Sequence, residues 1–357
     1  MLALVLMTKT AWCLLLIMCF PIACVDGDQP IRYPERMSLW VQNLPEESFT
    51  ESISFCETHQ LNLNVNLMRG EWNQSILAKL CSEAATHDVA IRLWPALPHE
   101  EGYWANQANA ETYVAYVDEI LTWVPAACPR VDGIMYDMEM PYDRFAELSQ
   151  MQSEGKSNLD IINWLLAGSD EERFIAAREI FAASVERVHQ LGLTAAVSTL
   201  PQNADDYADG DETVARAMWT PIEGIAWDSI AFQVYRNLFQ LNYPPADGSQ
   251  YSSGLIASYA QSVKEAFGDR GALDLGMAGG PRIEDGLGES AELQADIAAA
   301  RAAGLSVGAL SIFALDGLRR LDDAADWVAV PEARAAVPTE ADESLRAIFR
   351  LLDSLEY

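Results

Sequence analysis

Two carboxylates, Asp137 and Glu139, stand two residues apart near the end of the apolar run Val131–Pro141, VDGIMYDMEMP. In a β-strand alternate side chains share a face, so both acids would project from one face together with Met135. Carboxyl groups this close raise each other's proton affinity, which suits an acid that must keep its proton near neutral pH. The same pair could hold a cation, or could be a solvated strand edge whose partners are arginines. The apolar context, with Gly133 marking a close backbone approach, favours a chemical site.

Eight short apolar runs, each predicted as a strand, alternate with amphipathic stretches along the chain. The runs are Met37–Leu44, Leu61–Leu67, Val89–Trp94, Val131–Pro141, Thr194–Leu200, Ser229–Tyr235, Leu273–Met277 and Leu305–Phe313. Helices are expected over Glu46–His59, Ser75–Thr86, Glu111–Val124, Ser252–Phe267 and Ala291–Ala303, and over Tyr142–Leu191 with interruptions near Gly155 and Gly168.

This alternation predicts an α/β fold of the (β/α)₈ TIM-barrel type. An open doubly wound sheet is the alternative, but it would want a glycine-rich phosphate turn after an early strand, and the sequence has none there. Barrel active sites lie at the carboxyl ends of the strands, where Pro141 would end the strand that carries the two acids.

The first residues, Met1–Ala23, have the pattern of an export signal. Lys9 supplies a positive charge, and Ala11–Ala23 is an apolar stretch too short to span a bilayer comfortably. Cys24 follows Pro-Ile-Ala, which resembles a bacterial lipobox, so lipidation of Cys24 is expected, with ordinary cleavage nearby as the alternative. We therefore expect residues 1–24 to be a signal peptide of the lipoprotein type and residues 25–357 to form one catalytic barrel. The mature protein would be exported, lipid-anchored in the cell envelope or extracellular.

Net charge, cysteine content and histidine positions limit the partners, disulfides and metal sites that the chain can have. The formal net charge of −30 would be repelled by nucleic-acid phosphates, so no nucleic-acid partner is expected. We also expect a monomer whose membrane contact is made only through a lipid anchor. After the signal, Cys56, Cys81 and Cys128 remain, an odd number; a Cys56–Cys81 bridge is one option and buried free thiols are another. The four histidines are scattered, so neither a metal nor a cofactor is expected.

Three short segments point to a known family. The run Asp132–Glu139, DGIMYDME, resembles the DGxDxDxE signature on the fourth barrel strand of family 18 glycoside hydrolases, with Met135 in place of the first aspartate of the inward-facing row. Phe232–Asn237, FQVYRN, is similar to the family's sixth-strand pattern of a tyrosine followed by an asparagine or aspartate. Phe313–Asp316, FALD, is similar to its last-strand ending, with Phe313 where a tryptophan usually forms the floor of the sugar pocket.

The resemblance implies an exported glycosidase that cleaves an N-acetylhexosamine-containing glycan with retention. Cleavage of a glycosidic bond needs an acid for the leaving oxygen and a negative group near the anomeric carbon. Glu139 would be the acid, the substrate's own acetamido oxygen would be the nucleophile, and Asp137 with Tyr235 would hold that group.

Further residues are candidates for binding the glycan. Gln233 shares its parity with Tyr235, so both could point into the barrel. Sugar rings stack on aromatic faces, and Trp94 and Phe313 both stand at expected strand ends. The remaining candidates for this mouth are Asn237, Arg92 and Glu71, of which Arg92 and Glu71 could equally form structural ion pairs.

Other functions remain open on the sequence alone. Met135 and Phe313 would also suit a carbohydrate-binding barrel without catalysis, although the retained Glu139 speaks against it. Convergent barrel glycosidases of the lysozyme-like type can also carry a DxE on a central strand. In a barrel lyase, isomerase or metal-dependent hydrolase the two acids would hold a cation, with Glu71, Glu284 and Asp316 available to assist.

Overall fold

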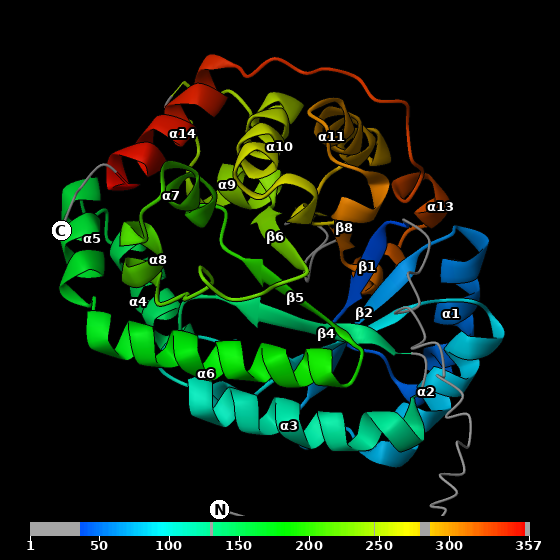
Figure 1. Ribbon diagram of the computed structural model, residues 1–357. Helices are drawn as coiled ribbons and strands as arrows, with labels where there is room; N and C mark the ends of the chain where they lie inside the picture. Colours follow the sequence, from blue (N-terminus) through cyan, green and yellow to red (C-terminus); the bar gives the residue numbers. More distant parts are fainter. Residues whose placement is uncertain (1–35, 129–130, 246, 279–285, 354–357) are drawn as a thin grey trace, which may run out of the picture. The chain divides into compact units, whose positions relative to one another are not determined.

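Eight parallel strands close into a barrel in sequence order, as the computed structural model shows (Figure 1). The structure describes residues 36–128, 131–245, 247–278 and 286–353. The strands are β1 (Ser38–Val41), β2 (Asn62–Met68), β3 (Ile91–Ala96), β4 (Val131–Met138), β5 (Thr194–Thr199), β6 (Ser229–Val234), β7 (Gly271–Gly276) and β8 (Leu310–Phe313). The predicted (β/α)₈ barrel is therefore confirmed.

Helices surround the barrel (Figure 1). They are α1 (Phe49–Thr58), α2 (Gln74–Thr86), α3 (Ala110–Ala127), α4 (Tyr142–Ser153), α5 (Asn158–Ala167), α6 (Glu171–Gln190), α7 (Asn203–Asp209), α8 (Thr213–Met218), α9 (Arg236–Asn242), α10 (Ser253–Phe267), α11 (Ser290–Ala302), α12 (Leu315–Leu318), α13 (Ala324–Trp327) and α14 (Glu340–Asp353). None of the helices in the described ranges is long and apolar enough to cross a membrane.

Two predicted strands are shorter in the structure. The first ends at Val41 because the Asp316 carboxylate takes the next two backbone N–H groups, those of Gln42 at 2.8 Å and Asn43 at 3.0 Å. The last begins only at Leu310, because Val307–Ala309 forms a 3₁₀ turn. In the first case a carboxylate that is distant in sequence, and in the second a 3₁₀ turn, uses backbone groups that a longer strand would use in the sheet.

The two faces of β4 separate packing from chemistry. Ile134, Tyr136 and Met138 point outward into the layer between sheet and helices, where burial of such side chains contributes ~1.5–3 kcal/mol each. The Tyr136 hydroxyl lies 2.7 Å from Ser184 Oγ on α6, so its polar tip is satisfied. Met135 belongs to a separate interior cluster, in which Trp40 and Trp94 meet edge to face at 4.9 Å. The predicted parity of this strand holds.

Three helices separate β4 from β5, as the interrupted helical pattern predicts. The first break is at Gly155, which has a φ of 68°, and Ser157 and Asp160 then form a capping box that starts α5. The second break lies at Gly168, after which Asp170 caps α6.

The disulfide joins Cys81 on α2 to Cys128 at the end of α3, with the two Cα atoms 5.2 Å apart. The Cys56–Cys81 bridge considered from the sequence is therefore wrong, because Cys81 faces α3. Cys56 is a buried free thiol, and burial raises its pKa to about 12.

The chain divides into Met1–Arg32 and Tyr33–Tyr357, and the barrel belongs to the second unit. The expected signal peptide and Cys24 lie outside the described residues.

The C-terminal helix α14, red in Figure 1, packs on α7, α8 and α10. Its Arg346 is buried, forms an ion pair with Asp205 on α7, and lies with its guanidinium carbon 3.8 Å from the centre of the Tyr259 ring. Its Asp342 accepts the Ser252 backbone N–H at 2.9 Å, just before α10. Helix α14, near the end of the sequence, thus packs on helices from the middle of the sequence.

Candidate active site

Asp137 and Glu139 lie at the carboxyl end of β4, where the loop after β3 holds their backbone. Ala105 pairs in parallel with Met138, donating its N–H to the Asp137 carbonyl at 2.8 Å and accepting the Glu139 N–H at 3.1 Å. This pairing extends the strand alternation as far as Glu139. At the other end of β4 a Cβ on Gly133 would collide with the Thr194 carbonyl oxygen, so the close approach inferred there is real.

Gln233 on β6 bridges the two acids. Its Nε2 donates to Asp137 Oδ1 and to Glu139 Oε1, at 2.9 Å each, and lies 3.2 Å from Ser198 Oγ on β5. Asp137 Oδ1 and Glu139 Oε1 are therefore separated by no more than twice the 2.9 Å that joins each of them to Gln233 Nε2. The prediction that Gln233 points into the barrel is confirmed.

A third acid, Asp274 on β7, lies deeper in the barrel, and the sequence analysis missed it. Its carboxylate accepts from Ser198 Oγ at 2.5 Å, from Trp40 Nε1 at 3.2 Å and from Ser311 Oγ. The signal was present, since Asp274 stands between leucines in a predicted strand. Only the closed barrel brings that strand to the back of the site.

Burial decides the protonation of these acids. Asp137 is 3% exposed, and burial followed by the charge of Glu139 raises its pKa well above the usual range. The pKa of Glu139 is also raised, chiefly by burial, and Asp274 adds to the effect on both groups. The two acids titrate as a coupled pair, and the charge of Glu139 raises the pKa of Asp137 further.

Tyr235 and Phe313 stand beside this pair. Tyr235 directly follows β6, and its ring centre lies 5.7 Å from that of Phe313 at the end of β8. The pKa of Tyr235 is raised well above the usual range, first by burial and then by the charges of Asp274, Asp137 and Glu139. The structure therefore brings Tyr235 and the acids into one neighbourhood.

The other candidate binding residues are not gathered there. Trp94 is 2% exposed, with its ring against Trp40, so its faces are covered. Arg92 lies in the amino-terminal half of β3 and pairs through Nε with Asp132 at 2.6 Å, away from the end that carries Glu139. The sequence left two roles open for Arg92, lining the mouth of the barrel or forming a structural ion pair. The structure shows the ion pair.

Asn237 and Glu71 lie on the segments that follow β6 and β2. Asn237 is on α9, and its Oδ1 accepts the Met277 N–H at 2.7 Å. Glu71 is exposed in the turn after β2, and its charge is felt by Tyr103.

An aromatic wall, defined as His99, Tyr103, Trp104, Tyr142 and Phe145, stands beside the acids. Tyr103 stacks on His99 at 4.6 Å and meets Trp104 at 5.0 Å, while Tyr142 and Phe145 on α4 complete the wall. The pKa of Tyr103 is raised to about 12, by burial and then by the charges of Asp137 and Glu139. Tyr142 is 40% and Phe145 43% exposed, so this wall offers open rings. The sequence analysis did not select these two residues, because an aromatic in a helix is usually core.

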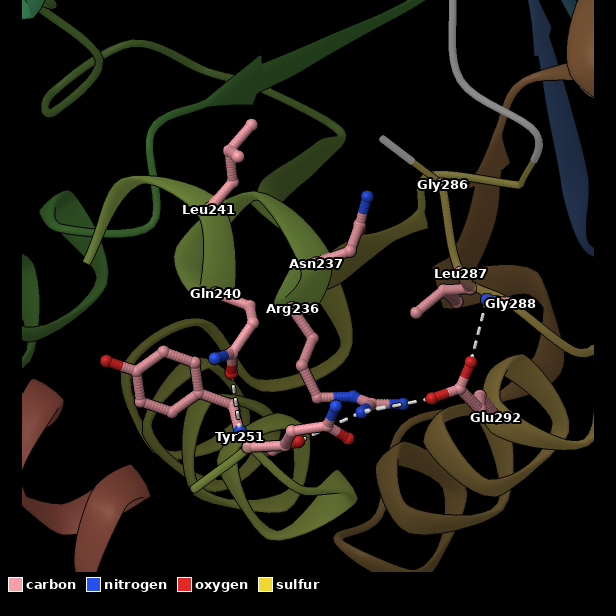
Figure 2. A pocket seen from close by; sticks show the side chains of 10 residues that line it. Arg236, Asn237, Gln240, Leu241, Tyr251, Gly286, Leu287, Gly288 and Glu292 are labelled. Atoms are coloured by element: carbon pink, nitrogen blue, oxygen red, sulfur yellow. Dashed lines mark hydrogen bonds and ion pairs between the residues drawn. The ribbon is translucent and has the colours of Figure 1, made fainter. Parts of the chain in front are cut away.

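The pocket drawn in Figure 2 is lined by residues other than the two acids. It has a volume of about 390 Å³ and is lined by residues of α9, α10's leading loop and the start of α11. Arg236 points between Tyr251, whose carbonyl accepts at 2.9 Å, and Glu292, at 3.9 Å. Neither Asp137 nor Glu139 lines this pocket, and its charged residues Arg236 and Glu292 form an ion pair with each other.

The described residues include no cluster of ligands that would support the alternative in which the two acids hold a cation. Within the described ranges no group of three or more histidine, cysteine, aspartate or glutamate residues is arranged to hold a metal ion. Asp316 is engaged with the backbone after β1, and Glu284 lies outside the described residues.

Comparisons with known proteins are limited to fold. No family model and no curated protein matches the sequence. Among solved structures, an L-ribulose 3-epimerase matches with a TM-score of 0.44 and 11% identity, over 89% of this chain and 94% of that chain. The YdjI aldolase from Escherichia coli K12 matches with a TM-score of 0.41 and 15% identity, over 80% and 77%. A xylose isomerase domain protein from Planctomyces limnophilus matches with a TM-score of 0.44 and 9% identity, over 88% and 95%.

These three proteins are named as an epimerase, an aldolase and an isomerase domain protein, not as glycoside hydrolases. Likenesses this distant carry no argument about activity, and the resemblance to family 18 rests on the short segments alone. The chain is a (β/α)₈ barrel with a buried acid pair at its carboxyl end.

Proposed function

We propose that the protein is a glycoside hydrolase that acts on an N-acetylhexosamine-containing glycan, with Glu139 as the general acid. The observation that carries the proposal is the bridge from Gln233 to Asp137 and Glu139 at the carboxyl end of the barrel, with Tyr235 beside it. The aromatic wall supplies rings on which sugars stack.

Glu139 is the acid that can meet a substrate. Asp137 and Asp274 are 3% and 1% exposed, whereas Glu139 is only partly buried. Its raised pKa favours a carboxyl group that still holds a proton when a leaving oxygen arrives.

The spacing of the acids supports retention with help from the substrate. Inverting enzymes separate their two carboxyl groups by about 6.5–9.5 Å to leave room for water. Here one amide nitrogen reaches both, and Asp137 is 3% exposed with a raised pKa, so it is not a free nucleophile. The substrate's acetamido oxygen then attacks the anomeric carbon while Asp137 and Tyr235 hold and polarise that group.

The test compares glycans with and without the acetamido group. A polymer that lacks the group should bind without being cut, and a thiazoline mimic of the cyclised intermediate should inhibit strongly, because the site is complementary to that species. Tyr235→Phe should weaken the mimic and slow turnover, since the lost hydroxyl contacts the group that becomes charged. Isolation of a sugar bound covalently to a protein carboxylate, as in a lysozyme-like retaining pair, would contradict the mechanism, as would inversion at the anomeric carbon.

A carbohydrate-binding barrel without catalysis is the second candidate. It is favoured by Met135, which packs with Trp40 and Trp94 where the family carries an aspartate. Binding of an N-acetylhexosamine oligosaccharide with no release of product over long incubation, at any pH from 4 to 8, would select this function.

A further inference from the structure

A chain of hydrogen bonds crosses the barrel from β7 to β4. It runs from Asp274 Oδ2 to Ser198 Oγ at 2.5 Å, from Ser198 Oγ to Gln233 Nε2 at 3.2 Å, and from Gln233 Nε2 to both acids at 2.9 Å. Four neighbouring strands each contribute to it, and Ser198 is fully buried within it.

Asp274 sets the direction of the hydrogen bonds in this chain, because its carboxylate accepts from the neighbouring side chains. The Trp40 indole N–H can only donate, and the Asp274 carboxylate receives it together with the hydroxyls of Ser198 and Ser311. Because the Ser198 hydrogen is directed to Asp274, its oxygen is left to accept from the Gln233 NH2 group, whose two hydrogens face three acceptors, so one N–H is shared between Ser198 and an acid. The Gln233 amide must then present nitrogen, and not oxygen, to the site.

We propose that Asp274 is a positioning residue for the acid pair: acting through Ser198, it fixes the Gln233 amide so that its N–H groups face Asp137 and Glu139. An amide turned the other way would place its oxygen against the two acids and could only accept a hydrogen bond from a protonated carboxyl group. The catalytic part of this inference rests on the proposed glycosidase function; the orientation of Gln233 does not.

The charged surroundings agree with this role. Burial raises the pKa of Asp274 above its usual range, while the hydrogen bonds from Ser198, Ser311 and Trp40 and the charge of Arg92 act in the opposite direction. Around the acid pair, Tyr103, Tyr113 and Tyr235 all have raised pKa values and stay neutral, and Asp274 is among the groups that raise the pKa of both acids. The hydrogen bonds that Gln233 donates lower the pKa of both acids, so loss of these bonds should raise both pKa values.

Titration of the substrate-free protein tests the chain. Ser198→Ala removes the link but keeps every charge, so the carboxyl ¹³C resonance of Glu139 should titrate about one pH unit higher, the value of one lost hydrogen bond. Ser184→Ala is the matched control, because it deletes a buried hydroxyl that touches the outer face of β4 through Tyr136. That control should titrate like the parent.

A double-mutant cycle assigns the effect to Asp274. In an Asp274→Asn background the Ser198 hydrogen is no longer directed away from Gln233, so Ser198→Ala should change the titration by less than a third of its effect in the parent. An undiminished effect of Ser198→Ala in that background would overturn the proposal. So would a Ser198→Ala titration equal to that of Ser184→Ala, a result that decides the matter even if Asp274→Asn does not fold.

Kinetics add a readout tied to turnover. Ser198→Ala should lower kcat about tenfold with KM unchanged, and Ser198→Thr, which restores the hydroxyl, should recover most of it. A change confined to KM would contradict a positioning role. If no glycan is cleaved by the parent, the proposed function fails, while the titration still tests the orientation of Gln233.

Discussion

Glu139→Gln is the substitution that most directly tests the acid. The amide oxygen of the new side chain can still accept from Gln233 Nε2, which lies 2.9 Å from Glu139 Oε1 in the parent, so the bridge survives while the transferable proton is lost. General acid catalysis contributes about 10²–10⁴ in rate, which corresponds to ~3–5 kcal/mol of transition-state stabilisation at 1.36 kcal/mol for each tenfold change. The fold should be intact, because one member of a crowded pair of acids becomes neutral.

Two substrates separate acid catalysis from general damage. A glycoside with a sugar leaving group should lose the full factor, whereas a dinitrophenyl glycoside, whose leaving group departs without a proton, should lose less than about tenfold. Glu101→Gln is the matched control, because Glu101 pairs with Arg69 at 2.8 Å at the surface, where such pairs contribute about 0–1 kcal/mol. Equal losses on both substrates, or full activity of Glu139→Gln on the sugar leaving group, would refute the assignment.

Three further predictions concern stability and location. Cys128→Ser should lower the free energy of unfolding in urea by up to ~4 kcal/mol, the chain-entropy value for a loop of 47 residues, and an unchanged midpoint would show that the bridge to Cys81 does not form. The raised pKa of Asp137 means that its contribution to stability is present below the ordinary carboxyl range near 4 and is lost as the pH rises towards the raised value; Asp137→Asn should flatten this decline in urea unfolding between about pH 4 and 8, whereas parallel curves would contradict it. Cys24→Ser should move the protein from the membrane fraction to the soluble fraction, and an unchanged distribution would rule out the lipid anchor.

The sequence predicted what depends on local pattern. The alternation along β4 placed Asp137 inward and Tyr136 outward, and the parity of Gln233 placed it in the barrel, because a strand has a fixed period of two. Gly155 and Gly168 marked the breaks between α4, α5 and α6, since helix ends are set by nearby residues.

What the sequence did not predict depends on contacts between distant segments. Asp274 joins the site only when β7 is placed next to β6 and β8, and Cys128 meets Cys81 only when α3 lies against α2. Arg92 has the inward parity of a mouth residue, but its depth along β3 places it with Asp132 instead. Parity fixes the face of a strand, whereas position along the barrel axis follows from register.

The docking of α14 has a consequence for resistance to proteolysis. Arg346 reaches Asp205 across 141 residues of sequence, and Asp342 reaches Ser252 at the start of α10. Without α14, helices α7, α8 and α10 lack the helix that packs on them, and Asp205 keeps its hydrogen bond from Ser262 but loses its ion pair with Arg346. Deletion of residues 340–353 should therefore make the barrel more susceptible to proteolysis.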